Sequence, residues 1–402
     1  MQTESTKTID KVVFLGETGF PIGLAAIQRM TLMAKALVFE GCKVTVVCRK
    51  GVWKKDEQVP FKNQGVFEGI YYVITSKSVF KPKGFFKRNL DKLRGIYGEF
   101  MYLKHLKKHE EIDVAIISNM KVFHILRYRI YSAYLNIPIV LNLVEMASSM
   151  QDRSGFFTRI NDYFMDNWII KLFHGSLPIS DKLANYYAVI APSKPSLKLP
   201  ILCDYDKFNI VKKDKDESYF LYCGSAAYME VIHFIIKSYK SISYNENTKL
   251  YMIISGGNKS SIKLLEQEIN NIFDDKPIKL FSNIPYIQLV HLYSNALALL
   301  IPLRPTIQDT SRFPHKIGEY LASGNPVVTT NVGEIKNYFE DGKTALIADT
   351  YSHSQFAEKM QFVLDNPELS KKIGMRGKKL GLKEFDYKIH GRRLQKFLQE
   401  LS

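Results

Sequence analysis

A lysine, a glutamate and a serine lie on one face of a helix predicted in the second half of this 402-residue chain. The stretch reads "RFPHKIGEYLASGNPVVTT" (312–330), where a proline suits the first helical turn and Gly324 suits the C-terminal cap. Lys316, Glu319 and Ser323 have the spacing i, i+3, i+7, which places them on one face. Such groups near a helix N-terminus can bind an anion and hydroxyl groups. The alternative is a solvated ion pair that contributes about 0.2–0.5 kcal/mol.

Small and polar residues follow five strands predicted in the same half of the chain. They are Gly224–Ser225, Gly256–Gly257, Asn283–Ile284–Pro285, Arg304–Pro305–Thr306 and Gly333–Glu334. The carboxyl ends of parallel strands meet at one edge of a sheet, and small residues let a ligand approach the backbone there. We interpret this edge as a ligand-binding site. The alternative is that each glycine ends its strand only because the turn requires it.

Strands and helices alternate along the chain, as is typical of an α/β fold. The strand "KVVFLG" is followed by a glycine-containing loop, a helix over 25–40 and the strand "GCKVTVVC", and a similar alternation restarts at "YFLYCG" (219–224). Continuous apolar strands indicate sheets that are covered on both faces. We predict two Rossmann-like, doubly wound domains, 1–198 and 199–385, that face each other across a cleft.

The composition limits the classes of partner and compartment. Lys and Arg exceed Asp and Glu by 56 to 40, which gives a formal net charge of +16 and favours a polyanionic partner such as nucleic acid, anionic lipid or a phosphorylated substrate. The polar N-terminus predicts no signal peptide, and no apolar run is long enough to span a membrane. Four cysteines without metal-ligand spacing predict buried free thiols in a reducing compartment. We therefore expect a cytoplasmic protein.

The second half resembles the C-terminal domain of group 1 (family 4) GT-B glycosyltransferases. The resemblance is carried by "FPHKIGEYLASGNPVV", "VGEIKNYFEDGKTALI", "LPILCDYDKF" and "SNIPYIQLVHLYSNALALLIPL". Within that family the chain is similar to enzymes of bacterial surface-polysaccharide assembly. The resemblance implies a GT-B fold, a nucleotide-sugar donor and a C-terminal helix (386–402) that packs back on the N-terminal domain.

The resemblance also assigns a donor role to Glu319. This residue matches the second glutamate of a Glu-x7-Glu motif, which in the family holds the ribose hydroxyls of the nucleotide sugar. The first glutamate would fall at Ser311, so the motif is broken here, and Asp309 is expected to serve a related role.

The family's usual phosphate clamp also differs in this chain. An Arg and a Lys often follow the first strand of the domain, but the sequence here reads "CGSAAYMEV". Arg304, Arg312 and Lys316 are the candidates to replace them. The residues expected to bind the donor are Gly23, Gly224, Ser225, Gly256, Gly257, Ile284, Asp309, Arg312, Phe313, Pro314 and Glu319.

The chemistry implied by the resemblance is sugar transfer with retention of the anomeric configuration, in which the leaving phosphate draws the proton from the acceptor hydroxyl. Arg, Lys and helix N-termini would neutralise the leaving group without a metal or cofactor. Asp204 and Asp206 of "CDYDKF" have the letters of a metal motif, but the resemblance places them in the hinge. The expected catalytic residues are Glu319, Lys316, Arg304 and Glu145.

Four residues of the first domain are candidates for the acceptor side. Gly23 and Arg29 resemble the family's loop beside the donor and acceptor, and Glu145 follows the strand "PIVLNLV" as a carboxylate that could position an acceptor. His124 follows another strand end, although a lone histidine is more often a packed or surface residue.

A basic stretch in the first domain favours a membrane surface. Residues 77–108 hold ten Lys or Arg against Asp91 and Glu99, with six interleaved aromatic residues: Phe80, Phe85, Phe86, Tyr97, Phe100 and Tyr102. Such a helical stretch can lie on an anionic membrane, here the inner face of the cell membrane, where a lipid-linked or glycan acceptor would be built. The alternative is that the aromatic residues belong to the core and the lysines to a solvated face.

Three other functions remain open at this stage. A nucleotide-sugar epimerase could use the same fold and cleft without an acceptor. The broken motif is also compatible with a catalytically degenerate subunit that only binds a nucleotide sugar. A nucleic-acid binder is the least favoured, because the basic residues are spread widely and no recognised nucleic-acid module is present.

Overall fold

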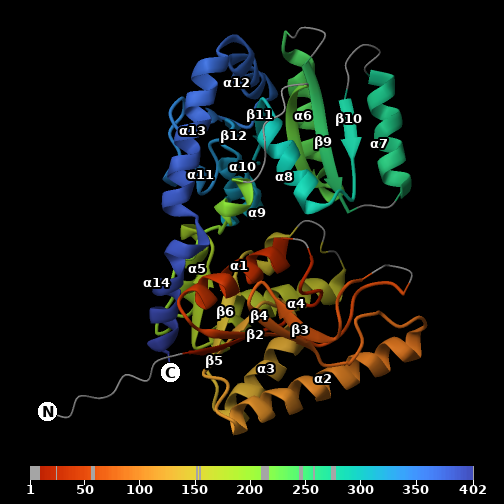
Figure 1. Cartoon of the computed structure of the whole chain (residues 1–402), viewed down its shortest axis with the longest axis vertical. Coiled ribbons are helices and arrows are strands. Elements are labelled where there is room, and N and C mark those ends of the chain that lie inside the picture. The colour runs from red at the N-terminus through yellow and green to blue at the C-terminus, as the bar shows by residue number, and fades with distance from the viewer. Residues whose placement is uncertain are drawn as a thin grey trace, which may run out of the picture. The chain divides into compact units, whose positions relative to one another are not determined.

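The computed structural model divides the chain into two compact units, residues 1–202 with 387–402 and residues 203–386 (Figure 1). The predicted boundaries lie at 198/199 and 385/386. The structure describes residues 10–23, 25–55, 59–150, 153, 155–209, 217–243, 248–256, 259–272 and 278–401.

The first unit is built on a seven-stranded sheet with the order β3-β4-β2-β1-β5-β6-β7. All neighbours pair in parallel except β3 and β4, which form an antiparallel hairpin. The central strands β1, β5 and β6 consist almost entirely of buried apolar residues, so the sheet is covered on both faces. The strands are β1 (Lys11–Leu15), β2 (Lys43–Cys48), β3 (Gln64–Phe67), β4 (Ile70–Ile74), β5 (Val114–Ile117), β6 (Ile139–Leu143) and β7 (Gly175–Pro178).

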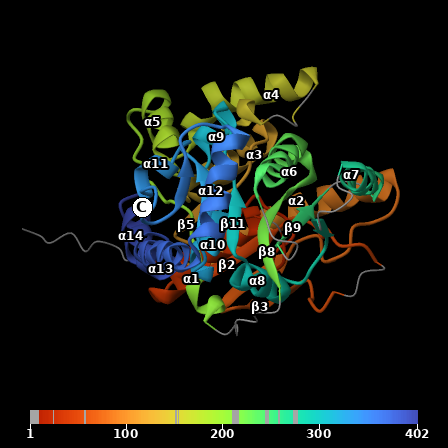
Figure 2. The ribbon, with the colours of Figure 1, turned by 90° about the horizontal axis from the view of Figure 1, so that it is seen from above.

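The helices of the first unit lie on both faces of this sheet. They are α1 (Ala25–Phe39), α2 (Phe85–Lys108), α3 (Val122–Leu135), α4 (Phe156–Asn167), α5 (Asp181–Ile190) and α14 (Tyr387–Gln399), with short 3-10 turns at Ala147–Ser149 and Ile169–Leu172. Right-handed crossovers place α1 on one face and α2, α3 and α4 on the other. Figure 2 shows α3 and α4 on the side of the sheet opposite α1 and α14.

The last helix of the chain, α14, packs against α1 within the first unit. Gly391 makes this approach close, because a Cβ atom there would lie 2.5 Å from the carbonyl oxygen of Ala36. Leu394, Phe397 and Leu398 of α14 then enter the same buried cluster as the apolar side of α1. The C-terminal end of the chain therefore completes the core of the N-terminal unit.

The second unit has a six-stranded parallel sheet with the order β10-β9-β8-β11-β12-β13. Its strands are β8 (Ser218–Ser225), β9 (Thr248–Ser255), β10 (Ile278–Phe281), β11 (Ala298–Ile301), β12 (Val327–Thr330) and β13 (Leu346–Ala348). The predicted doubly wound architecture is thus confirmed in both units.

Helices connect the successive strands of this second sheet, and two more, α12 and α13, follow its last strand. They are α6 (Met229–Ser241), α7 (Lys259–Ile272), α8 (Tyr286–Asn295), α9 (Ile307–Ser311), α10 (Lys316–Ser323), α11 (Ile335–Tyr338), α12 (His353–Asp365) and α13 (Pro367–Glu384), with 3-10 turns at Tyr205–Phe208 and Ala226–Tyr228. The apolar sides of α6 and α12 share one buried cluster with the strands. As predicted, α10 is capped at its C-terminal end by Gly324 in the left-handed conformation.

Two further expectations concern the thiols and the membrane. Cys42, Cys48, Cys203 and Cys223 are all free and buried, as predicted. Over the part of the chain that the structure describes, no helix has the length and apolarity needed to cross a bilayer.

A buried arginine ties α1 to the sheet of the first unit. Arg29 is 1% exposed, and its guanidinium donates to Asn142 Oδ1 (2.9 Å), to the Leu199 carbonyl (2.8 Å) and to the Pro200 carbonyl (2.7 Å). Burial lowers the pKa of Arg29 to about 9. Asn142 in turn donates to Ser118 Oγ (3.0 Å), so β5, β6, α1 and the 199–200 segment are joined by one network.

Arg29→Met should lower the free energy of unfolding by about 3 kcal/mol, because a buried amide oxygen and two carbonyls lose a charged donor. Urea denaturation followed by circular dichroism measures the change. Arg392→Met, at an exposed position of α14, is the matched control and should stay within about 0.5 kcal/mol of the parent chain. Equal stability of the two variants would contradict a structural role for Arg29.

Candidate active site

The sheet of the second unit has a topological switch point between β8 and β11. From β8 the chain proceeds to β9 and β10 toward one edge, and from β11 it proceeds to β12 and β13 toward the other. Ligands of doubly wound sheets bind at the carboxyl ends of the strands beside such a point. Gly224 and Ser225 end β8, and Arg304 follows β11, so the switch point brings these predicted residues to one place.

A buried carboxylate organises the end of β11. Asp309 is 1% exposed and accepts from the backbone N–H of Arg304 (2.9 Å) and from Arg304 Nε (2.8 Å). Its other oxygen lies 2.7 Å from Arg312 Nη2. Burial alone would raise the pKa of Asp309, but the hydrogen bonds from Arg304 and the charge of Arg312 hold it below its ordinary value. The carboxylate therefore stays ionised between two guanidinium groups.

The two arginines of this cluster differ in exposure. Arg304 is 2% exposed, whereas the side chain of Arg312 is 21% exposed. Arg312 Nη1 donates to the hydroxyl of Tyr228 (2.8 Å), and its guanidinium carbon lies 4.9 Å from the centre of the Tyr228 ring. Arg312 thus presents a positive charge at the surface. Arg304 is closed off from solvent, and its hydrogen bonds hold the Asp309 carboxylate in the position where it pairs with Arg312.

Glu319 lies half-buried in the first turn of α10, the turn that Lys316 begins. The hydroxyl of Tyr286, the first residue of α8, donates to Glu319 Oε1 (3.1 Å). Burial raises the pKa of Glu319, and the charge of Lys316 and the Tyr286 hydrogen bond oppose that shift. A carboxylate with one oxygen held by a tyrosine can accept hydroxyl hydrogen bonds on the other.

Tyr286 is a site residue that the sequence did not suggest. Its position directly after Pro285, at the end of a predicted strand, was the available signal. The Nζ atom of Lys207 lies 5.5 Å from the centre of the Tyr286 ring, so a residue of the 203–210 region also belongs to this corner of the second unit.

The glycines predicted at the strand ends lie at the same edge. Gly256 follows β9 with a left-handed φ of 70°, and a Cβ atom there would lie 3.5 Å from Ser225 Oγ. Ser255 Oγ donates to the Gly224 carbonyl (3.1 Å), which joins the ends of β8 and β9. Gly257 lies outside the described residues.

In the first unit, Gly23 and Glu145 occupy separate loops. Gly23 is exposed and precedes α1, and Glu145 is half-buried two residues after β6. Beyond Glu145 the backbone N–H groups of Ala147 and Ser148 donate to the carboxylate of Asp166 (3.0 and 2.9 Å). The Glu145 loop is therefore anchored by a hydrogen-bonded turn.

His124 lies between two arginines rather than alone. Its Nε2 is 3.4 Å from Arg49 Nη1, and its Nδ1 is 3.3 Å from Arg127 Nη1. Burial first and the neighbouring arginines second lower the pKa of His124 to about 3, so the ring is neutral near pH 7. A neutral imidazole carries one N–H, which means that one of its two contacts brings two donors together. The network is therefore short of acceptors.

The buried carboxylate of Glu99 compensates only part of this positive charge. It is 0% exposed, accepts from Arg127 Nη2 (2.8 Å) and from the Tyr128 hydroxyl (3.0 Å), and burial raises its pKa to about 7. Arg49 is 8% exposed, and its Nε atom has no hydrogen-bond partner among the described residues.

Further cations surround Arg49 at the carboxyl ends of β2 and β5. Burial first and then the charges of Arg49, Lys92, Lys81 and Lys121 lower the pKa of Lys50. These groups lie beside the switch point of the first sheet, between β1 and β5. The carboxylates of Glu17 and Asp91 also interact with Arg49 and Lys50, respectively. The cations still outnumber the carboxylates, so the arrangement is a second polar site whose positive charge suits an anionic group.

Comparison with known proteins gives the family of the second unit. Residues 205–380 match the family described as glycosyl transferases group 1. This unit is therefore similar to the glycosyl transferases of that group. Curated protein sequences gave no match to the chain.

Solved structures share the fold of the whole chain. Sucrose-phosphate synthase from Thermosynechococcus elongatus superposes with a TM-score of 0.75 at 12% identity, over 97% of this chain and 99% of that chain. A glycosyltransferase from Rickettsia africae gives 0.69 at 13% identity over 98% of each chain. HepE from Anabaena, in complex with UDP-glucose, gives 0.67 at 11% identity over 97% of this chain and 99% of that chain. The predicted GT-B fold is confirmed.

The second unit has a buried serine at the position where the resemblance predicts the first motif glutamate. Ser311 is 0% exposed in the short helix α9, and its Oγ donates to the Ile307 carbonyl (2.6 Å). Phe313, two residues later, is 2% exposed and stacks on Tyr338 with ring centres 5.5 Å apart, while Pro314 is half-buried. The segment between β11 and α10 is therefore packed by its own side chains.

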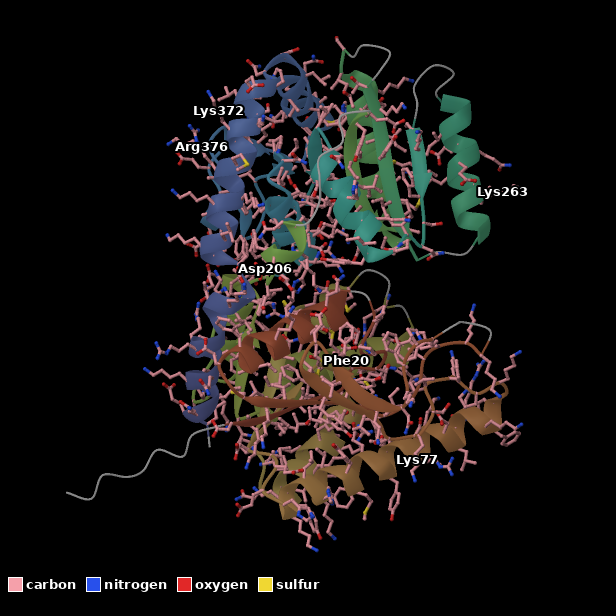
Figure 3. All side chains as sticks on the ribbon, in the orientation of Figure 1. Phe20, Lys77, Asp206, Lys263, Lys372 and Arg376 are labelled. Carbon is pink, nitrogen blue, oxygen red and sulfur yellow. The ribbon has the colours of Figure 1, made fainter. Side chains whose placement is uncertain are left out.

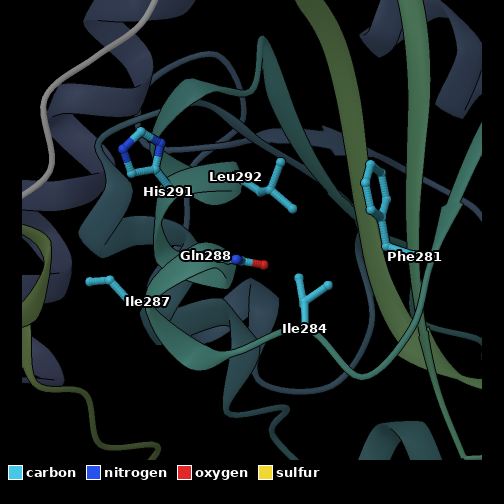
Figure 4. Close-up of a pocket in the computed structure, with 6 residues that line it drawn as sticks. All are labelled: Phe281, Ile284, Ile287, Gln288, His291 and Leu292. Carbon is cyan, nitrogen blue, oxygen red and sulfur yellow. The ribbon is translucent and has the colours of Figure 1, made fainter.

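An apolar groove of about 430 Å³ runs beside α8 in the same domain. It is lined by Phe281, Ile284, Ile287, Gln288, His291 and Leu292. Figure 4 shows Gln288 and Leu292 on the side of α8 toward Phe281, with Ile284 in the segment that precedes the helix. The groove contains the predicted residue Ile284. None of the charged candidate residues lines it, so the groove and the charged groups at the switch point are separate features of this unit.

The two aspartates of "CDYDKF" point to different environments. Asp204 is 7% exposed, and its carboxylate lies 4.0 Å from Lys207 Nζ, whereas Asp206 (labelled in Figure 3) is exposed. Over the described residues no group of three or more His, Cys, Asp or Glu side chains gathers as metal ligands would.

Ser311→Glu, which restores the family spacing, should lower the free energy of unfolding by about 3 kcal/mol, because the carboxylate enters a closed position without a partner. Chemical denaturation measures the change. The control is Ile307→Glu in the same helix, because Ile307 is 62% exposed. This substitution should lower the free energy of unfolding by less than about 0.5 kcal/mol. A Ser311→Glu variant that is fully stable and binds UDP more tightly would show that this position faces the ligand.

Proposed function

We propose that the protein is a retaining, family 4-like glycosyltransferase that moves a hexose-like sugar from a nucleotide-diphosphate sugar to a hydroxyl group of a glycan or lipid-linked acceptor in bacterial polysaccharide biosynthesis. The observation that carries the proposal is the geometry of the switch point in the group 1 domain. There Lys316 and Glu319 of α10 lie close enough to Cys223, the residue before Gly224, for their charges to act on its pKa, and the Tyr320 hydroxyl of the same helix accepts from the Cys223 backbone N–H (3.0 Å). Arg312, in the segment before α10, adds a second cation.

The donor proposed is a UDP-sugar. Glu319 would accept from the ribose hydroxyls, with Tyr286 fixing its other oxygen. The structure of HepE, which shares the fold, contains UDP-glucose, and this supports uracil as the first base to test. Ile284 and the apolar groove beside α8 would lie toward the base.

The leaving diphosphate would be neutralised by Arg312 and Lys316, with Arg304 as a positioning residue. In the reaction the bond between C1 of the sugar and the phosphate oxygen breaks, and the acceptor oxygen bonds to C1 on the same face. The leaving phosphate oxygen takes the proton of the acceptor hydroxyl. Cations that are already in place stabilise the charge that develops on that oxygen, so the proposal needs neither a metal nor a cofactor.

The acceptor side is proposed for the first unit. Glu145 would position the hydroxyl group, and the cluster around Arg49, Lys50 and Lys121 would bind a phosphate group of the acceptor, because its donors outnumber its acceptors. An acceptor of this kind, a sugar linked to a lipid through phosphate, fits assembly at the cytoplasmic face of the cell membrane.

A second function is favoured by one observation. Ser311 is buried and Asp309 is paired with two arginines, so Glu319 would face the ribose without the first motif carboxylate, which the resemblance predicts at position 311. A subunit that binds a nucleotide sugar without transferring it would have this site. Product formation distinguishes the two functions.

The purified chain should hydrolyse a UDP-sugar slowly and release UDP and the free sugar, a reaction that mass spectrometry detects in a panel of UDP-, GDP- and dTDP-sugars. An acceptor with a lipid-linked phosphate should accelerate UDP release. UDP binding without turnover of any donor would favour the degenerate subunit, and exchange of solvent deuterium into the recovered donor would favour an epimerase.

Glu319→Gln should weaken UDP binding about tenfold, because the carboxylate accepts charged hydrogen bonds from the ribose. Since burial raises the pKa of Glu319, its proton returns at a pH above the ordinary value of 4.5, and the advantage of the parent chain over the variant should shrink as pH falls from 8 to 5. Calorimetric titration at several pH values measures both. Glu368→Gln, at an exposed position of α13, is the control. An affinity ratio that does not change with pH would contradict the role of the carboxylate.

Arg312→Met should reduce affinity for UDP about tenfold and leave affinity for uridine nearly unchanged, because the guanidinium meets the diphosphate and not the nucleoside. The matched control is Arg376→Met on the exposed side of α13 (Figure 3). Equal losses for both ligands would place Arg312 away from the phosphates.

A further inference from the structure

Helix α2 has two apolar sides. The side that packs on the sheet is marked by the buried residues Gly95, Glu99, Leu103 and Leu106. On the opposite side a stripe of large apolar residues follows the spacing i, i+4, i+7, i+11, i+15 and is exposed to solvent, with exposed fractions from 43% to 85%. This stripe consists of Phe86, Leu90, Leu93, Tyr97 and Met101.

Helix α3 repeats this arrangement. Its inner side is marked by Ile125, Tyr128, Ser132 and Leu135, which are buried. Its outer side carries an exposed stripe at i, i+3, i+7, i+11, formed by Phe123, Leu126, Ile130 and Tyr134. Helix α4 and the residue after it present a third set: Phe156, Phe157, Ile160, Tyr163, Phe164 and Trp168.

The three outer sides belong to one face of the first unit. Right-handed crossovers place α2, α3 and α4 on the same face of the sheet. The ring of Phe100 on α2 packs on Tyr134 of α3 (5.7 Å between centres), and Asn161 of α4 accepts from the backbone N–H of Val122 at the start of α3 (3.0 Å). Figure 1 shows α2 and α3 beside each other on this face. We call these exposed apolar residues of α2, α3 and α4 the outer helical face.

The charges of the same helices are sorted by sign. Exposed cations flank the stripes, namely Lys87, Arg94, Lys104 and Lys108 on α2, Arg159 on α4 and Lys171 after α4. The acidic residues of the three helices are Asp91, which is half-buried, and Glu99, Asp162 and Asp166, which are at most 7% exposed. Glu99 and Asp162 pair with arginines, and Asp166 accepts two backbone N–H groups. The outer helical face is therefore apolar, aromatic and positively charged.

These properties decide which occupant fits. A second copy of the chain would bring the same cations and no exposed carboxylate from these helices to pair with them. Exposed apolar surface of this extent is uncommon on soluble proteins unless it binds something. Some helices carry aromatic and leucine side chains on one side, with Lys and Arg at the margins of that side. Such helices lie in the interface of an anionic bilayer, where tyrosine and tryptophan are favoured.

We propose that the outer helical face docks on an anionic lipid bilayer, with the apolar side chains of α2, α3 and α4 inserted at the headgroup level and the flanking cations on lipid phosphates. The inference uses no residue of the donor site, so it stands independently of the proposed glycosyl transfer. It extends the membrane prediction made for residues 77–108 to α3 and α4, which carry little of the basic charge.

Vesicle co-sedimentation of the full chain tests the proposal. The chain should bind vesicles of phosphatidylcholine and phosphatidylglycerol (3:1), bind pure phosphatidylcholine at least tenfold more weakly, and lose affinity as salt rises. The triple variant Phe86→Gln/Ile130→Gln/Phe157→Gln keeps every charge and should bind at least tenfold more weakly than the parent. Its control is Leu264→Gln/Leu369→Gln/Met375→Gln, which removes exposed apolar residues of the second unit and should bind as the parent does.

Charge and insertion have separate readouts. Lys87→Glu/Lys104→Glu/Arg159→Glu should abolish the preference for anionic vesicles, whereas Lys372→Glu/Arg376→Glu/Lys379→Glu on α13 should not. In a Trp53→Phe background Trp168, which is 57% exposed, is the remaining tryptophan, and its emission should shift to the blue on binding. The apolar and charge variants should melt and bind UDP as the parent does, because the altered side chains are exposed. Trp53 is half-buried against the core of the first unit, so variants in the Trp53→Phe background are compared with Trp53→Phe itself.

Three results would overturn the proposal. The first is no binding to either kind of vesicle. The second is equal binding of the apolar triple variant and the parent, which would leave only charge attraction. The third is a concentration-dependent dimer in analytical ultracentrifugation that the apolar triple variant abolishes, which would make a second copy the occupant.

Discussion

The ion pair between Asp309 and two arginines is the interaction on which the proposed donor site of this protein depends. Two guanidinium groups near the end of one strand would repel each other, and one of them is 2% exposed. Asp309 compensates both charges at once and also accepts the backbone N–H of Arg304, so the chain after β11 is held in one conformation. The consequence is that Arg312 faces the surface with its charge intact. It contacts Tyr228, which lies between the end of β8 and the start of α6.

The same interaction explains how the site differs from the pattern of its family. The sequence suggested Asp309 as a substitute for the glutamate that is missing at Ser311. In the structure the Asp309 carboxylate is occupied by Arg304 and Arg312, and the Ser311 hydroxyl is bonded to its own helix. The proposed donor site is built from Glu319, Lys316, Arg312 and the Tyr286 hydroxyl, which remain partly exposed. Glu230 is exposed at the same switch point, but its carboxylate lies 3.4 Å from Arg304 Nη1 and pairs with it.

The fold could be predicted from the sequence because the strands are continuous apolar runs and the helices between them are capped by recognisable residues such as Gly324. The strand ends could be predicted for the same reason, and with them Gly224, Ser225 and Arg304. The Tyr286–Glu319 hydrogen bond could not, because it joins residues 33 positions apart on two helices whose packing the sequence does not state. The buried role of Arg304 was hidden likewise, since nothing local distinguishes an arginine that binds phosphate from one that pairs with Asp309.

The orientation of α2 shows the limit of periodicity most clearly. Its sequence contains two apolar sides, and spacing alone does not say which one meets the sheet. Close approach decides it: Cβ atoms at Gly95 and Gly98 would lie 2.0 Å and 2.7 Å from carbonyl oxygens of Arg49 and Thr75, so only this side can pack there. Glu99 on the same side then meets Arg127 of α3, and the phenylalanine and leucine stripe is left outside.

A crystal structure of the chain with UDP tests the central claim most directly. We expect the nucleotide at the carboxyl ends of β8 and β11, with ribose hydroxyls on the free oxygen of Glu319, the diphosphate within hydrogen-bond distance of Arg312 and Lys316, and the Asp309 pair unchanged. Density for UDP at another place in the second unit, or a diphosphate bound after Asp309 has released its arginines, would contradict this account of the site.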